Sequence, residues 1–227
     1  MTRKDLGRFP IGLLAFGSIT AYAQVEQVTD LTVTDPQAMV ATIDQYIASG
    51  EVDAQSVNLL AHIHDGVDPS THTVVAIYDG LETMESDMEE RLASSAWATL
   101  LRSTASISKA NSTALAIQLR TWGDNAWSEG GYLAAVLVNA ADNASWLAAQ
   151  DEWNRTNKIE NPGMVRIVKL RGAPGNHAVL IASSSYADLI NFMEDVEASD
   201  EFATMRGAAE GQVVGVTYYR VVKVWHP

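Results

Sequence analysis

The pattern of hydrophobic and polar positions predicts an alternation of strands and helices. Between residues 25 and 121, segments with an apolar residue at every second position alternate with segments in which apolar residues recur every three or four positions. Thr34-Asp35-Pro36 marks one boundary, because a capping side chain followed by proline in the first turn is typical of a helix start. The predicted order is a strand over 25–33, a helix ending at Gly50, strands over 57–64 and 71–78, a helix from Leu81, a short helix with Trp97 and Leu101, and a strand over 113–121.

The helix that begins near Leu81 combines an apolar stripe with an acidic face. Its apolar residues recur at helical spacing, and a stripe of this kind is expected to face the core. Glutamates occupy the positions between them and are expected to face solvent. The stripe consists of Leu81, Met84, Met88 and Leu92, and the acidic face of Glu82, Glu85, Glu89 and Glu90.

The second half of the chain repeats the first. When the sequence is shifted by 105 positions, residues 72–99 align with residues 177–204 without a gap, and eight of the 28 pairs are identical. The identical pairs include His72/His177 and Met88/Met193, and Trp97 aligns with Phe202. Such self-similarity indicates a duplicated structural unit. We therefore expect one unit over residues 24–124 and a second over residues 125–227.

Each copy predicts the order β-α-β-β-α-β, which is the ferredoxin-like split βαβ unit. Its four-stranded antiparallel sheet buries one face under two helices and leaves the other face free. A free apolar face must be covered. The predicted fold class is therefore α+β, with two tandem ferredoxin-like units packed sheet to sheet as an intramolecular α/β barrel.

A short motif occurs once in each copy and carries a resemblance to a known superfamily. It has the form Ala-Ser-x-x-(Trp/Phe)-Ala-Thr and spans residues 93–99 and 198–204. With the duplicated two-helix unit, it resembles the dimeric α/β-barrel superfamily, which includes antibiotic-biosynthesis-monooxygenase-like proteins. Haem-binding members of this superfamily place an axial histidine on a helix of the second unit. The second unit here has only His177 and His226, so the resemblance implies no haem, and we expect no cofactor.

Composition narrows the classes of function. The 227 residues include 28 acidic and 15 basic ones, a net charge of −13, which disfavours broad binding to nucleic acid or anionic lipid. No cysteine is present, so disulfides, thiolate metal sites and a cysteine nucleophile are excluded. No glycine-rich phosphate loop, nucleophile elbow or zinc-binding helix motif occurs.

The amino terminus predicts export. Residues 1–23 combine Arg3, Lys4 and Arg8 with an uncharged run and end in Ala21-Tyr22-Ala23, as a secretory signal peptide does. The apolar run is too short for a permanent membrane anchor. We expect a periplasmic or secreted chain that begins at Gln24. Removal of three basic residues and one acidic residue changes its net charge from −13 to −15.

Two histidines on one predicted strand are the first candidates for a site. The alternation over 57–64 places His62 and His64 on the sheet face that lines the barrel, while Leu59 and Ile63 lie under the helices. Such a pair could chelate a metal with a third ligand. A polar patch at a strand end is the alternative that we favour, so no metal is expected. His72 and His177, which match across the copies, are open to a functional or a structural interpretation.

Tyr78 and Arg120 complete the set of candidates for ligand binding or proton transfer. Other arginines and Lys223 also fall on predicted strands, where exposed edge positions or a buried anionic partner would explain them. The tryptophans and tyrosines could line a cavity for a flat organic ligand or simply pack the core.

Three hypotheses about function follow. The first is an exported protein that binds a small apolar or aromatic molecule between the two sheets. The second is a cofactor-independent enzyme of the monooxygenase-like or isomerase-like kind, and the third is a structural protein without a ligand. The sequence leaves the ligand and the oligomeric state open.

Overall fold

The computed structural model describes residues 23–64, 68–123 and 127–227. The predicted signal peptide, apart from Ala23, lies outside the described residues, as do residues 65–67 and 124–126. The described residues form eight strands and six helices. In chain order these are β1 (Val25–Val33), α1 (Pro36–Ile47), β2 (Ser56–His64), β3 (His72–Tyr78), α2 (Leu81–Ala93), α3 (Ser95–Thr104), β4 (Ser108–Trp122), β5 (Tyr132–Ala140), α4 (Asn143–Thr156), β6 (Gly163–Arg171), β7 (His177–Ser183), α5 (Tyr186–Ala198), α6 (Asp200–Ala209) and β8 (Gly211–Trp225).

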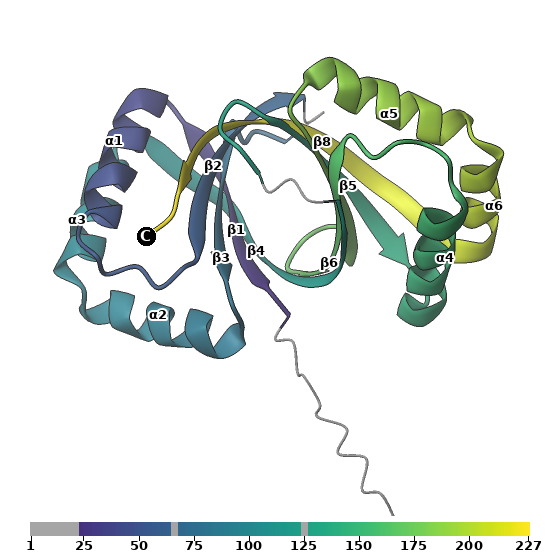
Figure 1. The fold of residues 1–227 in the computed structure, drawn as a ribbon. Helices are drawn as coiled ribbons and strands as arrows, with labels where there is room; N and C mark the ends of the chain where they lie inside the picture. Colours follow the sequence, from purple (N-terminus) through teal and green to yellow (C-terminus); the bar gives the residue numbers. More distant parts are fainter. Residues whose placement is uncertain (1–22, 65–67, 124–126) are drawn as a thin grey trace, which may run out of the picture.

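The eight strands close into one antiparallel barrel. Their order around it is β1-β3-β2-β8-β5-β7-β6-β4, so each half of the chain contributes four adjacent strands. Helices α1–α3 cover the barrel on one side and α4–α6 on the other (Figure 1). This arrangement confirms the predicted fold class, two ferredoxin-like sheets packed against each other within one chain.

The two faces of each sheet build two kinds of core. One cluster fills the barrel and draws on both halves of the chain, with Leu60, Val75, Val168 and Leu180 among its members. Two other clusters lie outside the barrel, each between one half's sheet and its helices. Because side chains alternate along a strand, one set of strands supplies both the interior and the exterior cores.

The long strands β4 and β8 join the two halves. Each has 15 residues and pairs with a strand of its own half and a strand of the other half. The end of β8 packs in the first half's outer core, where Trp225 Nε1 donates to Asp44 Oδ1 of α1 at 2.6 Å. The end of β4 packs Trp122 against the second half's outer core. Each half therefore completes the helix-covered core of the other.

The repeated motif caps a helix in each half. Ser94 Oγ accepts a hydrogen bond from Trp97 N at 2.8 Å, and Ser199 Oγ accepts one from Phe202 N at 3.1 Å. These bonds satisfy one of the free amides in the first turn of α3 and of α6. The motif thus specifies a helix start and places an aromatic ring against the outer core of each half.

The orientation expected for α2 is wrong. Leu81, Met88 and Leu92 are exposed, Leu92 to 88%, while Asp87 is 1% exposed and faces the sheet. Only Met84 of the apolar stripe packs against the outer core. The helix is rotated because Asp87 and Arg91, one turn apart, form an ion pair beneath it. A paired charge can therefore occupy the side that hydrophobicity alone assigns to leucine and methionine.

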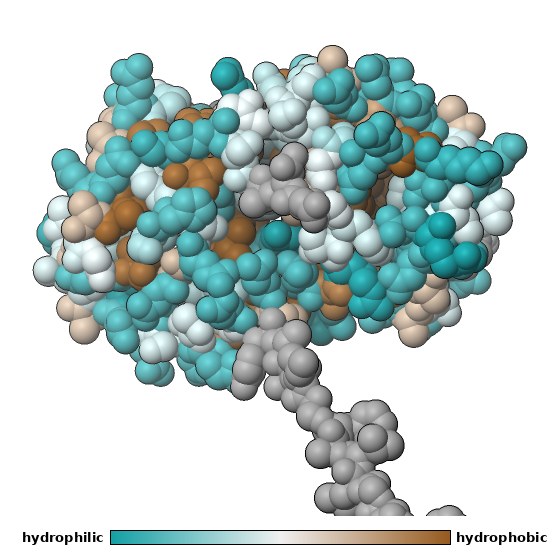
Figure 2. Space-filling model, viewed as in Figure 1, coloured by the Kyte–Doolittle hydropathy of each residue, from teal (hydrophilic) through white to brown (hydrophobic). Residues whose placement is uncertain are grey.

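The face of the molecule shown in Figure 2 is largely hydrophilic. On the face shown in Figure 2, hydrophobic residues are visible mainly in hollows between hydrophilic ones. Among the described residues, none of the helices has both the length and the hydropathy that a bilayer crossing requires.

Because each half completes the other, neither is expected to stand alone. A chain of residues 24–124 would expose the free edges of β2 and β4 together with the apolar barrel face. We predict that it self-associates or aggregates, which sedimentation velocity measures. A stable monomer of this fragment would contradict the closed barrel.

Candidate functional site

A cavity of about 270 Å³ lies inside the barrel. Its walls are mostly aliphatic and come from strands of both halves, with Leu60, Leu133 and Leu180 among them. Polar side chains gather in two places along β1, at Glu26 and at Asp30. Four residues of one strand separate them by about 13 Å. The cavity is therefore an apolar chamber with a polar group at each end.

At the Asp30 end of the cavity, three side chains from three strands form a hydrogen-bonded chain. His62 Nε2 lies 2.7 Å from Thr73 Oγ1, and Thr73 Oγ1 donates to Asp30 Oδ1 at 2.7 Å. The second oxygen of Asp30 accepts a hydrogen bond from the exposed Ser112 at 2.7 Å. The register brings the chain together, because Thr73 is paired with both Asp30 and Leu60, two residues before His62.

This chain fixes the tautomer of His62. The single proton of the Thr73 hydroxyl is donated to Asp30, so Thr73 accepts from an Nε2–H of His62. The carboxylate thereby orients the imidazole through the threonine, because a hydrogen bond at one ring nitrogen sets which nitrogen carries the proton. Tyr219 lies opposite His62 on β8, with ring centroids 4.8 Å apart in an edge-to-face contact. Burial and the nearby charge of Asp30 raise the pKa of Tyr219, so its phenol stays protonated.

At the Glu26 end of the cavity, a buried ion pair joins the two halves. Arg166 Nη1 of β6 donates to Glu26 Oε1 of β1 at 2.5 Å, and Glu26 is 1% exposed. Burial raises the pKa of Glu26, and the adjacent guanidinium opposes this shift. The guanidinium carbon also lies 6.0 Å from the ring centroid of Trp127, which lines the cavity. A strand arginine is thus buried with an anionic partner, which is one of the two alternatives that the sequence left open.

The duplication shows which of these polar groups the fold itself does not need. Leu137, Leu170 and Ala178 of the second half occupy the positions of the three residues in the hydrogen-bonded chain. The second half therefore builds the same strands with aliphatic side chains. Polar groups at these positions of the first half are not required for folding, which favours a functional role.

His62 is the predicted residue that lines the cavity, but His64 does not share its face. The pairing of β2 with β8 is irregular between the two histidines, so His62 is paired with Tyr219 and His64 with the adjacent Tyr218. His64 is exposed and contacts the rings of Tyr186 and Tyr218 outside the barrel. The expectation of a histidine pair on one face is wrong, because a bulge reverses the side on which the later residue lies.

Tyr78 and Arg120 also lie outside the barrel. Tyr78 is fully buried beneath α2. Arg120 is exposed and forms an ion pair with Asp151 of α4 at 2.9 Å. The pairing of β4 with β6 is irregular between Gln118 and Arg120, which turns the arginine outward. The four candidates therefore do not form one site.

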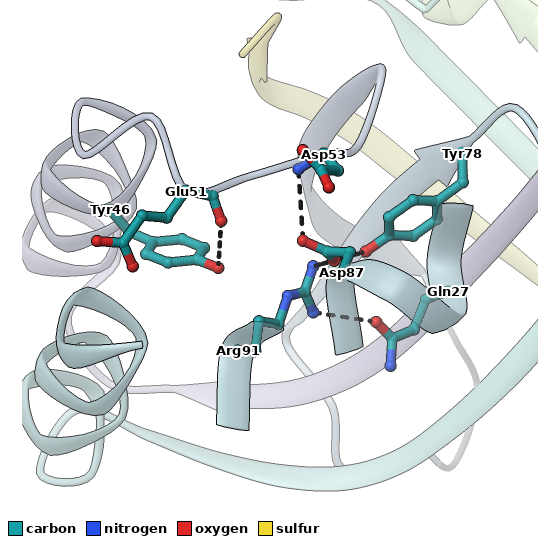
Figure 3. Close-up of polar contacts among 7 residues, drawn as sticks. All are labelled: Gln27, Tyr46, Glu51, Asp53, Tyr78, Asp87 and Arg91. Carbon is teal, nitrogen blue, oxygen red and sulfur yellow. Dashed lines mark hydrogen bonds and ion pairs between the residues drawn. The ribbon is translucent and has the colours of Figure 1, made fainter. Parts of the chain in front are cut away.

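Tyr78 belongs to a second polar cluster, between α2 and the sheet of the first half (Figure 3). Its hydroxyl donates to Asp87 Oδ2 at 2.7 Å and accepts from Arg91 Nη2 at 2.5 Å. Arg91 also forms an ion pair with Asp87, donates to Gln27 Oε1 at 3.4 Å and lies 4.8 Å from the Trp97 ring centroid. Burial and the hydrogen bond to Asp87 raise the pKa of Tyr78, so the cluster holds a neutral phenol.

In the second half, the positions of this cluster hold one serine and two apolar residues. Ser183, Phe192 and Val196 align with Tyr78, Asp87 and Arg91, and Phe192 and Val196 belong to the outer core of that half. The polar cluster is closed, because Tyr78 and Asp87 are almost fully buried. Its evident role is to hold α2 on the sheet.

The matched histidines are structural. His177 Nδ1 lies 2.7 Å from Asn176 Oδ1, and its Nε2 lies 2.6 Å from Asn143 Oδ1 at the start of α4. The ring also packs on Trp146 at 4.7 Å. His72 is buried at the same strand position, with Nδ1 2.9 Å from Thr71 Oγ1. Both therefore fix the start of a strand.

Comparison with known proteins identifies the fold. Neither a protein-family model nor a curated protein matches the sequence. A provisionally assigned monooxygenase from Fusobacterium nucleatum has a similar structure, with a TM-score of 0.60 and 13% identity over 90% of this chain and 95% of that one. An anthrone oxidase-like protein has a TM-score of 0.53 and 13% identity over 90% and 93% of the two chains. A haem-binding protein from Thermus thermophilus has a TM-score of 0.56 and 9% identity over 88% and 92%.

The fold is the dimeric α/β barrel. The resemblance inferred from the duplicated motif is confirmed at this level, with both units of the barrel in one chain. At identities of 13% or less, the likeness concerns the fold and not the activity.

The residues of the second half do not fit a haem group. Both ring nitrogens of His177 are bonded to asparagine side chains, and His226 lies in the exposed C-terminal dipeptide after β8. The space under α4 and α5 is packed with Trp146, Leu189 and Phe192. Among the described residues, histidines and carboxylates also form no group of three suited to a metal ion.

Sequence reasoning found His62 but missed its partners. Asp30, Thr73 and Tyr219 lie on three different strands, and their distance along the chain conceals their contact. A comparison of the two copies could have indicated Thr73, because this polar residue aligns with Ala178 in the gapless segment. The same comparison could have indicated Asp87, which aligns with Phe192.

The cluster beneath α2 makes a prediction about stability. Asp87→Ala would leave the guanidinium of Arg91 buried without its carboxylate, so we expect a loss of about 3–5 kcal/mol in the free energy of unfolding. Glu90→Ala, an exposed change on the same helix, should alter it by no more than about 0.5 kcal/mol. The triple variant Tyr78→Phe, Asp87→Leu, Arg91→Leu should recover most of the loss. Urea denaturation measures all three, and equal effects of the two alanine variants would contradict the structural role.

Proposed function

We propose that the protein binds a small, mostly apolar molecule inside the barrel. The observation that carries this proposal is the hydrogen-bonded chain from Asp30 through Thr73 to His62 at one end of an aliphatic cavity. Ligand pockets combine apolar walls with a few fixed polar groups in this way. The volume of about 270 Å³ lies near the lower limit of such pockets and suits a compact molecule of one to three fused rings.

Charge restricts the ligand further. Asp30 and Asp68 line the His62 end, and a hydrogen bond from Ser70 lowers the pKa of Asp68. The whole chain carries a net charge of −13. A negatively charged ligand would be repelled at this end, so a neutral molecule with a hydroxyl or carbonyl group near His62 fits best.

A second candidate function is cofactor-independent chemistry on such a molecule. The oriented imidazole of His62 favours it, because a histidine held by a carboxylate relay can accept a proton from a weak acid. The likeness to an anthrone oxidase-like fold suggests anthrone as a probe. Uptake of one O₂ per anthrone, with formation of anthraquinone and water, would support catalysis, and binding without oxygen uptake would support the first candidate alone.

The two histidines of β2 provide a matched test of binding. We predict that His62→Phe leaves the fold intact and weakens binding of the neutral probe 1-naphthol at least tenfold, about 1.4 kcal/mol. His64→Phe should not change the affinity, because this side chain lies outside the barrel. Isothermal titration calorimetry and thermal melting of the same samples give both quantities.

Three outcomes would count against the proposal. Equal affinity of the wild type and the His62 variant for 1-naphthol would show that the histidine is not part of the binding site. A loss of thermal stability in the His62 variant without any change in affinity would make His62 a structural residue. Absence of 1-naphthol binding to the wild type would contradict the proposal as a whole.

We also propose that the chain is exported to the periplasm or the medium. Residues 1–23 and their cleavage pattern support this proposal. The intact mass of the natural protein should correspond to a chain that begins at Gln24. A retained Met1 would contradict export by this signal.

A further inference from the structure

The outer side of α2 carries a row of exposed apolar side chains. Among the residues that the structure describes, six large hydrophobic side chains are exposed, and three of them are Leu81, Met88 and Leu92 of this helix. Their spacing of seven and four positions places them along one side of the helix, over about 16 Å. We call these three residues the α2 stripe. Exposed apolar residues are normal when they are scattered singly, whereas a group on one face marks a surface for interaction.

Specific buried contacts hold the α2 stripe on the outside. Asp87 and Arg91 form an ion pair on the opposite side of the helix, and Asp87 also accepts a hydrogen bond from Tyr78 on the sheet. Asp87 is 1% exposed, whereas Leu92, in the next turn, is 88% exposed. Rotating α2 to bury the stripe would break the ion pair and expose both charges. The outward orientation is therefore a fixed property of the fold.

The second copy of the unit is built in the opposite way. Its helix α5 packs Leu189, Phe192 and Val196 into the outer core of that half. The residue that aligns with Leu92 is Glu197, which is exposed. The same backbone can therefore present a polar outer side at this position. An exposed leucine there contributes nothing to folding, which favours a role in contact with a partner.

Acidic side chains border the α2 stripe. Glu85 follows Leu81 by four residues, and Glu89 precedes Leu92 by three, so each is a neighbour of the stripe on the helix surface. Both glutamates are exposed. The one basic residue of the helix, Arg91, is paired with Asp87 beneath it. The surface therefore combines apolar contacts with uncompensated negative charge.

This charge decides among the possible occupants. A second copy of the chain would bring an equally acidic helix and a net charge of −13 against the first. An anionic lipid surface would be repelled in the same way. A partner with an apolar face flanked by lysine or arginine meets both features at once, because its cations offset the carboxylates that border the stripe.

We propose that the α2 stripe is a docking site for a basic amphipathic helix of another protein. The apolar side chains of that helix pack on Leu81, Met88 and Leu92, and its basic side chains pair with Glu85 and Glu89. Helices are recognised in this way through apolar anchors at helical spacing. A stripe of about three turns matches a single helix better than a partner surface of about 800 Å². The site lies outside the barrel, so it is separate from the ligand site proposed above.

The test measures binding of the labelled peptide acetyl-LKKLLKLLKKLLKL-amide by fluorescence anisotropy. As a helix, this peptide has leucines on one face and lysines on the other. We expect the wild type to bind it at least tenfold more tightly than a peptide of the same composition whose order gives no apolar face. The affinity should fall as the concentration of NaCl rises, because salt screens exposed charges.

Leu92→Glu is the deciding variant, because it introduces the residue type that the second copy has at this position. It removes the most exposed apolar side chain of the α2 stripe and adds a negative charge. Docking on the stripe predicts at least tenfold weaker binding of the peptide. A general attraction between an acidic protein and a basic peptide predicts equal or tighter binding instead. Leu81→Gln tests the other end of the stripe and should weaken binding at least threefold.

Val213→Glu is the matched control. Val213 is 52% exposed and lies where β8 pairs with β5 of the second half, so the variant makes a similar change away from α2. It should not weaken binding of the peptide. Thermal melting verifies folding, and both glutamate variants are expected to melt as the wild type does, because both positions are exposed.

Four outcomes would overturn the proposal. Two of them are absence of peptide binding to the wild type and binding by Leu92→Glu that is as tight as that of the wild type. A wild-type dimer that Leu92→Glu dissociates, as measured by sedimentation velocity, would assign the stripe to a second copy. Binding of the wild type but not of Leu92→Glu to vesicles of phosphatidylcholine and phosphatidylglycerol would assign it to lipid. None of these results bears on the barrel cavity, so the proposed function is tested separately.

Discussion

A ferredoxin-like sheet has helices on one face only, so its other apolar face must be buried. The two sheets bury these faces against each other. Strands β4 and β8, of 15 residues each, join the sheets by pairing with strands of the opposite half. Their ends enter the helix-covered core of the opposite half, as the contact between Trp225 and Asp44 shows. The halves are thus joined by backbone hydrogen bonds and by shared cores, and the barrel interior is enclosed as a consequence.

Enclosure gives the interior its chemical character. Polar groups inside a barrel lose water, so each must find a partner or lower the stability of the fold. Glu26 and Asp30 find partners in Arg166 and Thr73, whereas the side-chain oxygen of Gln118 does not. The second half places aliphatic residues at the positions of Glu26, Asp30 and Gln118. The two copies have therefore diverged in chemistry while retaining one backbone, and most of the polar interior belongs to the first copy.

Much of the fold could be predicted from the sequence because it follows from local patterns. Alternation along the strands, the capping serines and the repeat are all visible within short stretches of chain, and the order of elements agrees with the structure. The site was less predictable because bulges and long-range pairing decide it. Irregular pairing on β2 and β4 turns His64 and Arg120 out of the barrel, and no local sequence pattern indicates a bulge at either place. Long-range contacts also decide which side of α2 faces the sheet. The buried pair of Asp87 and Arg91 lies on that side, and its partner Tyr78 lies on another element.

The proposed function requires that the barrel interior is a binding site and not simply a core. Native mass spectrometry of the protein purified from its own host tests it most directly, with an Ala135→Phe variant that fills the cavity as the reference. We expect one small neutral molecule bound per wild-type chain and none bound to the variant. A wild-type mass equal to that of the polypeptide alone, or the same molecule retained by the variant, would contradict it.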